Sequence, residues 1–124
     1  MPWTILVAED EGLAAMAIED ELLREGYAVV LAADGQAALE AAASQPPDLL
    51  LTDLRMPRLD GSGLIRALRA TRPGLPVVVM TGYAPAGGAA AFGRDGEAPV
   101  SLFAKPLDMD AVLVELRKLL PGCQ

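Results

Sequence analysis

The sequence contains no histidine and only one cysteine, and both shortages limit the chemistry that the chain can perform. Without histidine, it cannot contain a Ser-His-Asp triad, a histidine general base or a phosphohistidine. The cysteine, Cys123, has no partner for a disulfide within the chain, which fits a reducing compartment. Carboxylates, hydroxyls and lysine are the groups left for any reaction.

Positive charge and long apolar runs are also scarce. Lys and Arg number 10 against 17 Asp and Glu, which gives a net charge of −7. This balance argues against direct binding to nucleic acid or to an anionic membrane, because both attract clustered Lys and Arg. No run approaches the roughly 18 apolar residues of a membrane span, and acidic residues follow the N-terminus too early for a signal peptide. We therefore expect a cytoplasmic protein.

The 124 residues have the length of one domain, and a hydrophobic fraction of 52% is that of a folded protein. We expect a single domain over residues 1–124, with its core in residues 4–120. Short apolar runs alternate with helical patterns five times, which predicts an α/β fold built on a parallel sheet. The expected strands are Thr4–Ala8, Ala28–Ala32, Leu49–Thr52, Val77–Thr81 and Val100–Ala104.

Apolar residues at spacings of three and four predict helices after the first, second, third and fifth strands. The last helix has a clear core face that includes Val112 and Leu116, and Asp108 is expected to cap its start. A further helix is expected between the fourth and fifth strands. Residues 84–99 contain four glycines and two prolines, so we expect this helix to be short, frayed or displaced.

Polar side chains stand where four of the expected strands end. In open α/β sheets, ligands bind beyond the carboxyl ends of the strands. Because parallel strands end at the same edge of the sheet, these side chains are expected to converge there. They are Glu9 and Asp10, Asp53, Thr81 with Gly82, and Lys105.

Each of these residues has an ordinary explanation when it is taken alone. Asp53 suits the start of a turn, and Glu9 with Asp10 suits a solvated loop or a helix cap. Thr81 can satisfy a backbone group, and Lys105 can be a surface lysine. Their coincidence at one edge favours a functional site over four separate explanations.

The combination suits phosphoryl transfer to a carboxylate. An Asp carboxylate is ionised at neutral pH and can attack without a general base. The incoming phosphoryl group is also negative, so the reaction needs positive charge nearby. Three carboxylates with water suit Mg²⁺, and Lys105 supplies a second positive charge. We therefore interpret Asp53 as a nucleophile, with Thr81 and backbone N–H groups near Gly82 placed to bind phosphoryl oxygens.

The segments LVAEDE, DLLLTDLRMPRLDG, VVVMTGYA and LFAKP occur in this order. In them the chain resembles bacterial response-regulator receiver domains, the CheY-like phosphoacceptors of two-component signalling, from about Ile5 to Leu120. The resemblance implies a flavodoxin-like, doubly wound fold with strand order 2-1-3-4-5. It also implies that the protein is a phosphorylation-dependent switch and not an enzyme that acts on other molecules. Its partner would be a sensor histidine kinase or a histidine phosphotransfer protein.

The same resemblance implies roles for single residues. Asp53 would be the phosphorylation site. Mg²⁺ would be held by Asp53, by Asp10 and by Glu9 through a water molecule. The backbone carbonyl of Arg55 would complete the protein ligands of the ion.

Residues on the other strands also receive roles from the resemblance. Thr81 would be the switch hydroxyl. Lys105 would bind the phosphate as a cation, with a cis peptide bond to Pro106. Pro57 and Gly61 would shape the loop after the phosphorylation site.

Two positions depart from the family pattern. Receiver domains commonly carry Tyr or Phe three residues before the lysine, where this chain has Leu102. Phe103 is expected on the opposite face of the strand, because side chains alternate along it. The second departure is the glycine-rich segment 84–99, which lies on the surface that most receivers use for output.

Other functions were weighed against the phosphorylation switch. One is a receiver-like scaffold that is never phosphorylated, and the charge cluster argues against it. Another is an FMN carrier or a small Mg²⁺-dependent phosphatase. The first strand leads into acidic residues and not into a phosphate-cradling loop, and position 55 is Arg, which breaks an Asp-x-Asp pair. The switch is expected to be either a stand-alone regulator or the receiver of a hybrid kinase.

Overall fold

A computed structural model describes residues 2–82, 98 and 100–121 of the chain. They form one five-stranded parallel sheet with helices on both faces. The strands lie in the order β2-β1-β3-β4-β5, so the flavodoxin-like, doubly wound fold is confirmed. They are β1 (Thr4–Ala8), β2 (Ala28–Ala32), β3 (Leu49–Asp53), β4 (Val77–Thr81) and β5 (Val100–Ala104).

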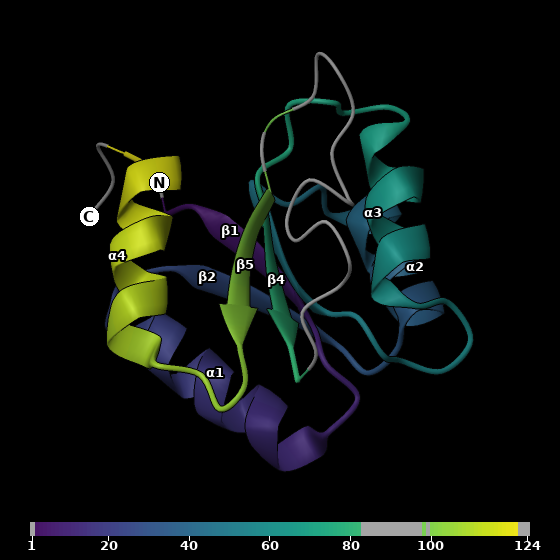
Figure 1. The fold of residues 1–124 in the computed structure, drawn as a ribbon. Helices are drawn as coiled ribbons and strands as arrows, with labels where there is room; N and C mark the ends of the chain where they lie inside the picture. The colour runs from purple at the N-terminus through teal and green to yellow at the C-terminus, as the bar shows by residue number, and fades with distance from the viewer. Residues whose placement is uncertain (1, 83–97, 99, 122–124) are drawn as a thin grey trace.

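Four helices are seen in the described residues: α1 (Gly12–Arg24), α2 (Gly35–Ser44), α3 (Gly61–Arg69) and α4 (Met109–Leu119). Figure 1 shows α1 and α4 on one face of the sheet and α2 and α3 on the other. None of the helices in this part of the chain is long and apolar enough to cross a membrane. The helix expected within residues 84–99 falls almost entirely outside the described residues.

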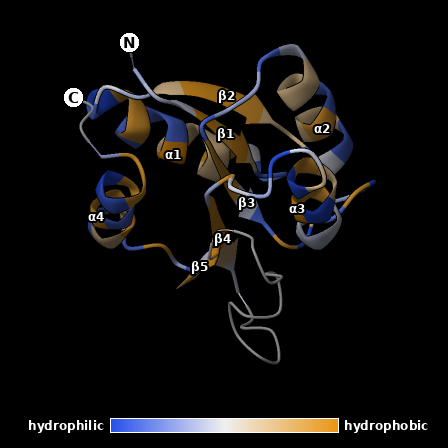
Figure 2. Cartoon of the chain, turned by 90° about the horizontal axis from the view of Figure 1, so that it is seen from above, coloured by the Kyte–Doolittle hydropathy of each residue, from blue (hydrophilic) through white to orange (hydrophobic). Residues whose placement is uncertain are grey.

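The central strands are buried on both faces, as their near-continuous apolar sequences predict. All residues of β3 and β4 are buried. Leu49 and Leu51 pack toward α1 and α4, whereas Leu50 packs toward α2 and α3. The hydropathy colouring in Figure 2 shows the same organisation, with hydrophobic strands between helices whose other sides are more polar. Trp3, just before β1, packs against the core on the α1 and α4 side.

Aspartates cap the start of three of the four described helices, α2, α3 and α4. Asp34 accepts a hydrogen bond from the Ala37 N–H at 2.7 Å and caps α2. Asp60 caps α3 through the Gly63 N–H at 2.8 Å. Asp108 caps α4, as the sequence predicted. These bonds satisfy amides that have no partner within their own helix.

Glycines occupy the first position of α1, α2 and α3, but they differ in their surroundings. A Cβ on Gly61 would overlap the Asp53 carbonyl oxygen and lie 2.9 Å from the Cα of Leu54. The Gly61 N–H also donates to the Leu54 carbonyl at 2.9 Å. A Cβ on Gly12 would meet nothing within 4 Å. Gly61 is therefore required by close packing of the chain behind Asp53, whereas Gly12 is not.

We predict that Gly61→Ala lowers the free energy of unfolding by about 1–3 kcal/mol, because backbone must move to admit the methyl group. Gly12→Ala is the matched control, since it makes the same change at the same helix position. It should be neutral or stabilising by up to about 1 kcal/mol. Urea denaturation of the three proteins measures both values. Equal midpoints for the two variants would show that the packing at Gly61 imposes no constraint.

Candidate functional site

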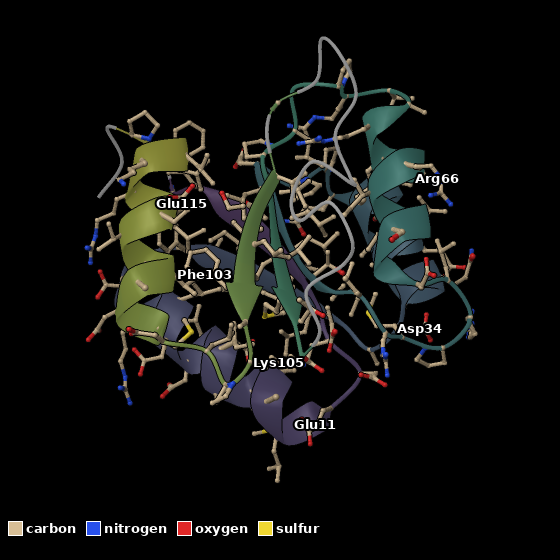
Figure 3. All side chains as sticks on the ribbon, viewed as in Figure 1. Glu11, Asp34, Arg66, Phe103, Lys105 and Glu115 are labelled. Atoms are coloured by element: carbon tan, nitrogen blue, oxygen red, sulfur yellow. The ribbon has the colours of Figure 1, made fainter. Side chains whose placement is uncertain are left out.

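The carboxyl edge of the sheet brings together charged residues from three strands. Glu9 follows β1, Asp53 ends β3 and Lys105 follows β5. The Lys105 Nζ lies 3.0 Å from Glu9 Oε1 and 2.5 Å from Asp53 Oδ2. Figure 3 shows Lys105 at this edge, beside the start of α1. The convergence that the sequence predicted is therefore present, and one lysine joins two of the carboxylates.

A third carboxylate completes an acidic cluster. One oxygen from each of Glu9, Asp10 and Asp53 lies within 4.8 Å of the others. Glu9 and Asp53 are only 2% and 8% exposed, whereas Asp10 is exposed. When ionised, the three groups carry three negative charges, and Lys105 balances one of them. Oxygen donors of this kind are the ligands that Mg²⁺ prefers, so the donor set fits the predicted ion.

Burial and charge act in opposite directions on the two groups that face each other. Burial raises the pKa of the Glu9 carboxyl, and its hydrogen bonds with Lys105 and the Glu11 amide oppose this only in part. Burial alone would lower the pKa of Lys105, but its hydrogen bonds to Asp53 and Glu9 outweigh burial and raise it. The lysine therefore stays protonated at neutral pH and supplies a fixed positive charge beside Asp53.

The Asp53 carboxylate is held in one orientation. The Arg55 N–H donates to its Oδ1 at 3.2 Å, while Lys105 donates to its Oδ2. The backbone carbonyl of Asp53 accepts a hydrogen bond from the hydroxyl of Thr52 at 2.8 Å. A carboxylate held in this way would lose little conformational freedom if it reacted. The sequence did not reveal the Thr52 contact, because a buried threonine in a strand needs no special partner.

The other predicted residues lie at the same edge. Thr81 is buried at the end of β4, and its carbonyl accepts a hydrogen bond from the Lys105 N–H at 2.8 Å. Gly82 is exposed, with open space where a side chain would stand. The Lys105–Pro106 peptide bond is cis, as the resemblance implied. The roles assigned to Thr81, Gly82 and the Arg55 carbonyl stay predictions.

Leu102 and Phe103 lie on opposite faces of β5, as strand alternation predicted. Leu102 packs with the core beside α2 and α3, and Phe103 packs with the core beside α1 and α4. Phe103 therefore does not replace the aromatic ring that receiver domains commonly carry at the position of Leu102.

Comparison with known proteins identifies the family. A family model described as the response regulator receiver domain matches residues 5–117. The chain belongs to the response-regulator receiver domain family. The family assignment agrees with the parallel strand order and with the acidic cluster beside Lys105.

Individual relatives show the same likeness. Response regulator MprA of Mycolicibacterium vanbaalenii is 38% identical over 120 residues, which cover 97% of this receiver domain and 51% of that protein. A response regulator receiver protein from Sinorhizobium medicae has a TM-score of 0.84 at 27% identity and covers 98% of this chain and 96% of its own. The receiver domain of the hybrid histidine kinase CckA has a TM-score of 0.78 at 30% identity, over 94% and 98% of the two chains. The chain spans about half the length of the curated relatives it matches.

We predict that Asp10→Asn weakens Mg²⁺ binding by at least about tenfold, because one of three carboxylates loses its charge. Asp20→Asn on the exposed side of α1 removes the same charge far from the cluster and serves as the control. NMR titration of both variants with MgCl₂ at constant ionic strength gives the two dissociation constants. Equal constants for Asp10→Asn and wild type would place the ion elsewhere.

Proposed function

We propose that this receiver domain is a phosphorylation-dependent signalling switch with Asp53 as its phosphoacceptor. A sensor histidine kinase or a histidine phosphotransfer protein donates the phosphoryl group, and the altered surface then regulates a partner protein. One observation carries the proposal. A buried carboxylate at the end of a central strand is oriented by the Arg55 amide and Lys105, within 4.8 Å of two further carboxylates.

The chain's own groups supply most of what the transfer needs. A carboxylate oxygen of Asp53 forms a bond to phosphorus while the bond from phosphorus to the donor nitrogen breaks. Lys105 balances negative charge on the phosphoryl oxygens as the bonds exchange. The Thr81 hydroxyl and the backbone N–H groups near Gly82 then bind the oxygens of the aspartyl phosphate. The domain catalyses only its own phosphorylation and dephosphorylation.

Mg²⁺ is the cofactor that we propose for this reaction. Asp10, Asp53 and the Arg55 carbonyl would hold it directly, with Glu9 acting through a water molecule. When bound, the ion supplies positive charge that lets an anionic phosphoryl group approach a cluster of carboxylates.

The larger setting is part of the proposal. We propose that residues 1–124 act as one receiver domain in the cytoplasm. Relatives include both a response regulator and the receiver of a hybrid histidine kinase, and either arrangement suits this domain. The net charge of −7 disfavours direct contact of this domain with nucleic acid or an anionic membrane.

Asp53→Asn should abolish phosphorylation, because an amide cannot serve as the attacking oxygen anion. Intact-protein mass spectrometry after incubation with acetyl phosphate and MgCl₂ should show one added phosphoryl group on wild type and none on the variant. Removing Mg²⁺ with EDTA should also prevent the gain. Asp20→Asn is the control and should be labelled like wild type. Stoichiometric labelling of Asp53→Asn would refute the assignment, and no labelling of wild type by any phosphodonor would favour the scaffold.

Lys105→Ala should leave the fold intact but uncouple phosphorylation from the change in the surface, because the cation that bridges β5 to Asp53 is gone. Comparing ¹H–¹⁵N spectra before and after phosphorylation measures this response. Amides outside the site should shift in wild type and much less in the variant. The exposed Lys118→Ala is the control. A full response in Lys105→Ala would make the lysine a bystander.

A further inference from the structure

The loop between β3 and α3 contains a strained turn. Arg58 has a φ of 72°, which is in the left-handed region that disfavours residues with a side chain. The Leu59 N–H donates to the Pro57 carbonyl at 2.8 Å across it. A three-residue turn with positive φ at its centre is the rare and strained form of γ-turn. Such a conformation persists only where its surroundings hold it.

The N-terminus of α2 provides those surroundings. The Arg58 guanidinium lies 3.7 Å from Asp34 Oδ2, while Oδ1 of the same aspartate caps α2. A Cβ on Gly35 would overlap the backbone of Leu59, so the helix and the turn are in direct contact. Figure 3 labels Asp34 near the end of α3 at which this loop enters. One side chain, Asp34, therefore joins α2 to the strained turn.

The same loop sets the orientation of Asp53. Its second residue, Arg55, donates its N–H to Asp53 Oδ1 at 3.2 Å. The two ends of the loop are joined by a hydrogen bond, because the N–H of Gly61, the first residue of α3, donates to the carbonyl of Leu54, the first residue after β3. A shift of the turn at Arg58 therefore moves a short segment whose first part is hydrogen-bonded to the nucleophile.

We propose that Asp34 and Arg58 are positioning residues for phosphoryl transfer to Asp53. Their ion pair holds the strained turn, and the turn holds the Arg55 amide on the carboxylate. Neither residue touches Asp53 in the structure. The inference rests on the proposed function, because it concerns the rate of that reaction. It adds α2 to the elements that determine how well the nucleophile is oriented.

The expected change in phosphorylation rate on losing the ion pair depends on how exposed Asp34 and Arg58 are. The side chain of Arg58 is 62% exposed, so solvent weakens its attraction to Asp34. Loss of the pair should therefore change the rate by roughly two- to fivefold and should not abolish the reaction.

The test uses substitutions that leave the other roles of these residues in place. Asp34→Asn removes the charge but keeps a side chain that caps helices well. Arg58→Ala removes the charge, and Arg58→Lys restores it on the same backbone. The exposed pair Asp20–Arg24 on α1, at 2.8 Å, is the matched control, with Asp20→Asn and Arg24→Ala as its variants.

Two measurements are made on each protein. The first is the rate constant of phosphorylation by acetyl phosphate at saturating MgCl₂. The second is hydrogen exchange at the Arg55 amide, followed by NMR without phosphodonor. Asp34→Asn and Arg58→Ala should each slow phosphorylation and speed Arg55 exchange by about two- to fivefold. The double variant should be no worse than either single one, and Arg58→Lys should stay within twofold of wild type.

The outcomes separate the inference from the proposed function. A labelled wild type with unchanged rates in the variants would overturn the inference alone. Slower phosphorylation with a lower urea midpoint and unchanged Arg55 exchange would also overturn it, because the pair would then be merely stabilising. Additive losses in the double variant would show that the two residues act separately. No phosphorylation of wild type would overturn both proposals.

Discussion

The contact of Lys105 with Asp53 and Glu9 is the interaction on which the geometry of the site depends. The three residues are far apart in the sequence, and only the strand order brings them to one edge. Glu9 is almost completely buried, and the Lys105 ammonium lies 3.0 Å from its carboxylate. Lys105 reaches past the end of β4, where its own amide is bonded to Thr81. One lysine thus offsets negative charge that the fold places at the carboxyl edge of the sheet.

Most of the fold could be predicted from the sequence, because the strands are apolar runs with sharp ends. Four of the five strands have the predicted bounds, and β3 is one residue longer because Asp53 continues the pairing with β4 opposite Met80. The site residues could be predicted for the same reason, since the end of each parallel strand fixes the edge at which its polar residue lies. The left-handed Arg58 and its pair with Asp34 could not be predicted. They depend on the packing of α2 against a loop that is distant in sequence.

Leu102 limits the kind of side-chain movement that is possible at β5 on the α2 and α3 side of the sheet. A leucine has neither a ring nor a polar tip, so movement at this position is the repacking of an aliphatic side chain within the core beside α2 and α3. The ion pair of Asp34 and Arg58 lies on this same side of the sheet. Phe103 packs on the other side, in the core that α1 and α4 share. The two faces of the sheet therefore differ at β5, with an aromatic side chain on the α1 and α4 side and an aliphatic one on the α2 and α3 side.

The position of Trp3, before β1, has a practical consequence for optical work on this protein. It is the single tryptophan of the chain and packs against the α1 and α4 core. The five residues of β1 separate it from Glu9, so the Cα atoms of Trp3 and Glu9 are about 20 Å apart, at opposite edges of the sheet. Its emission is therefore suited to following the loss of the core on unfolding. It is a poor reporter of ions or phosphoryl groups at Asp53, for which a dye attached near that edge would be needed.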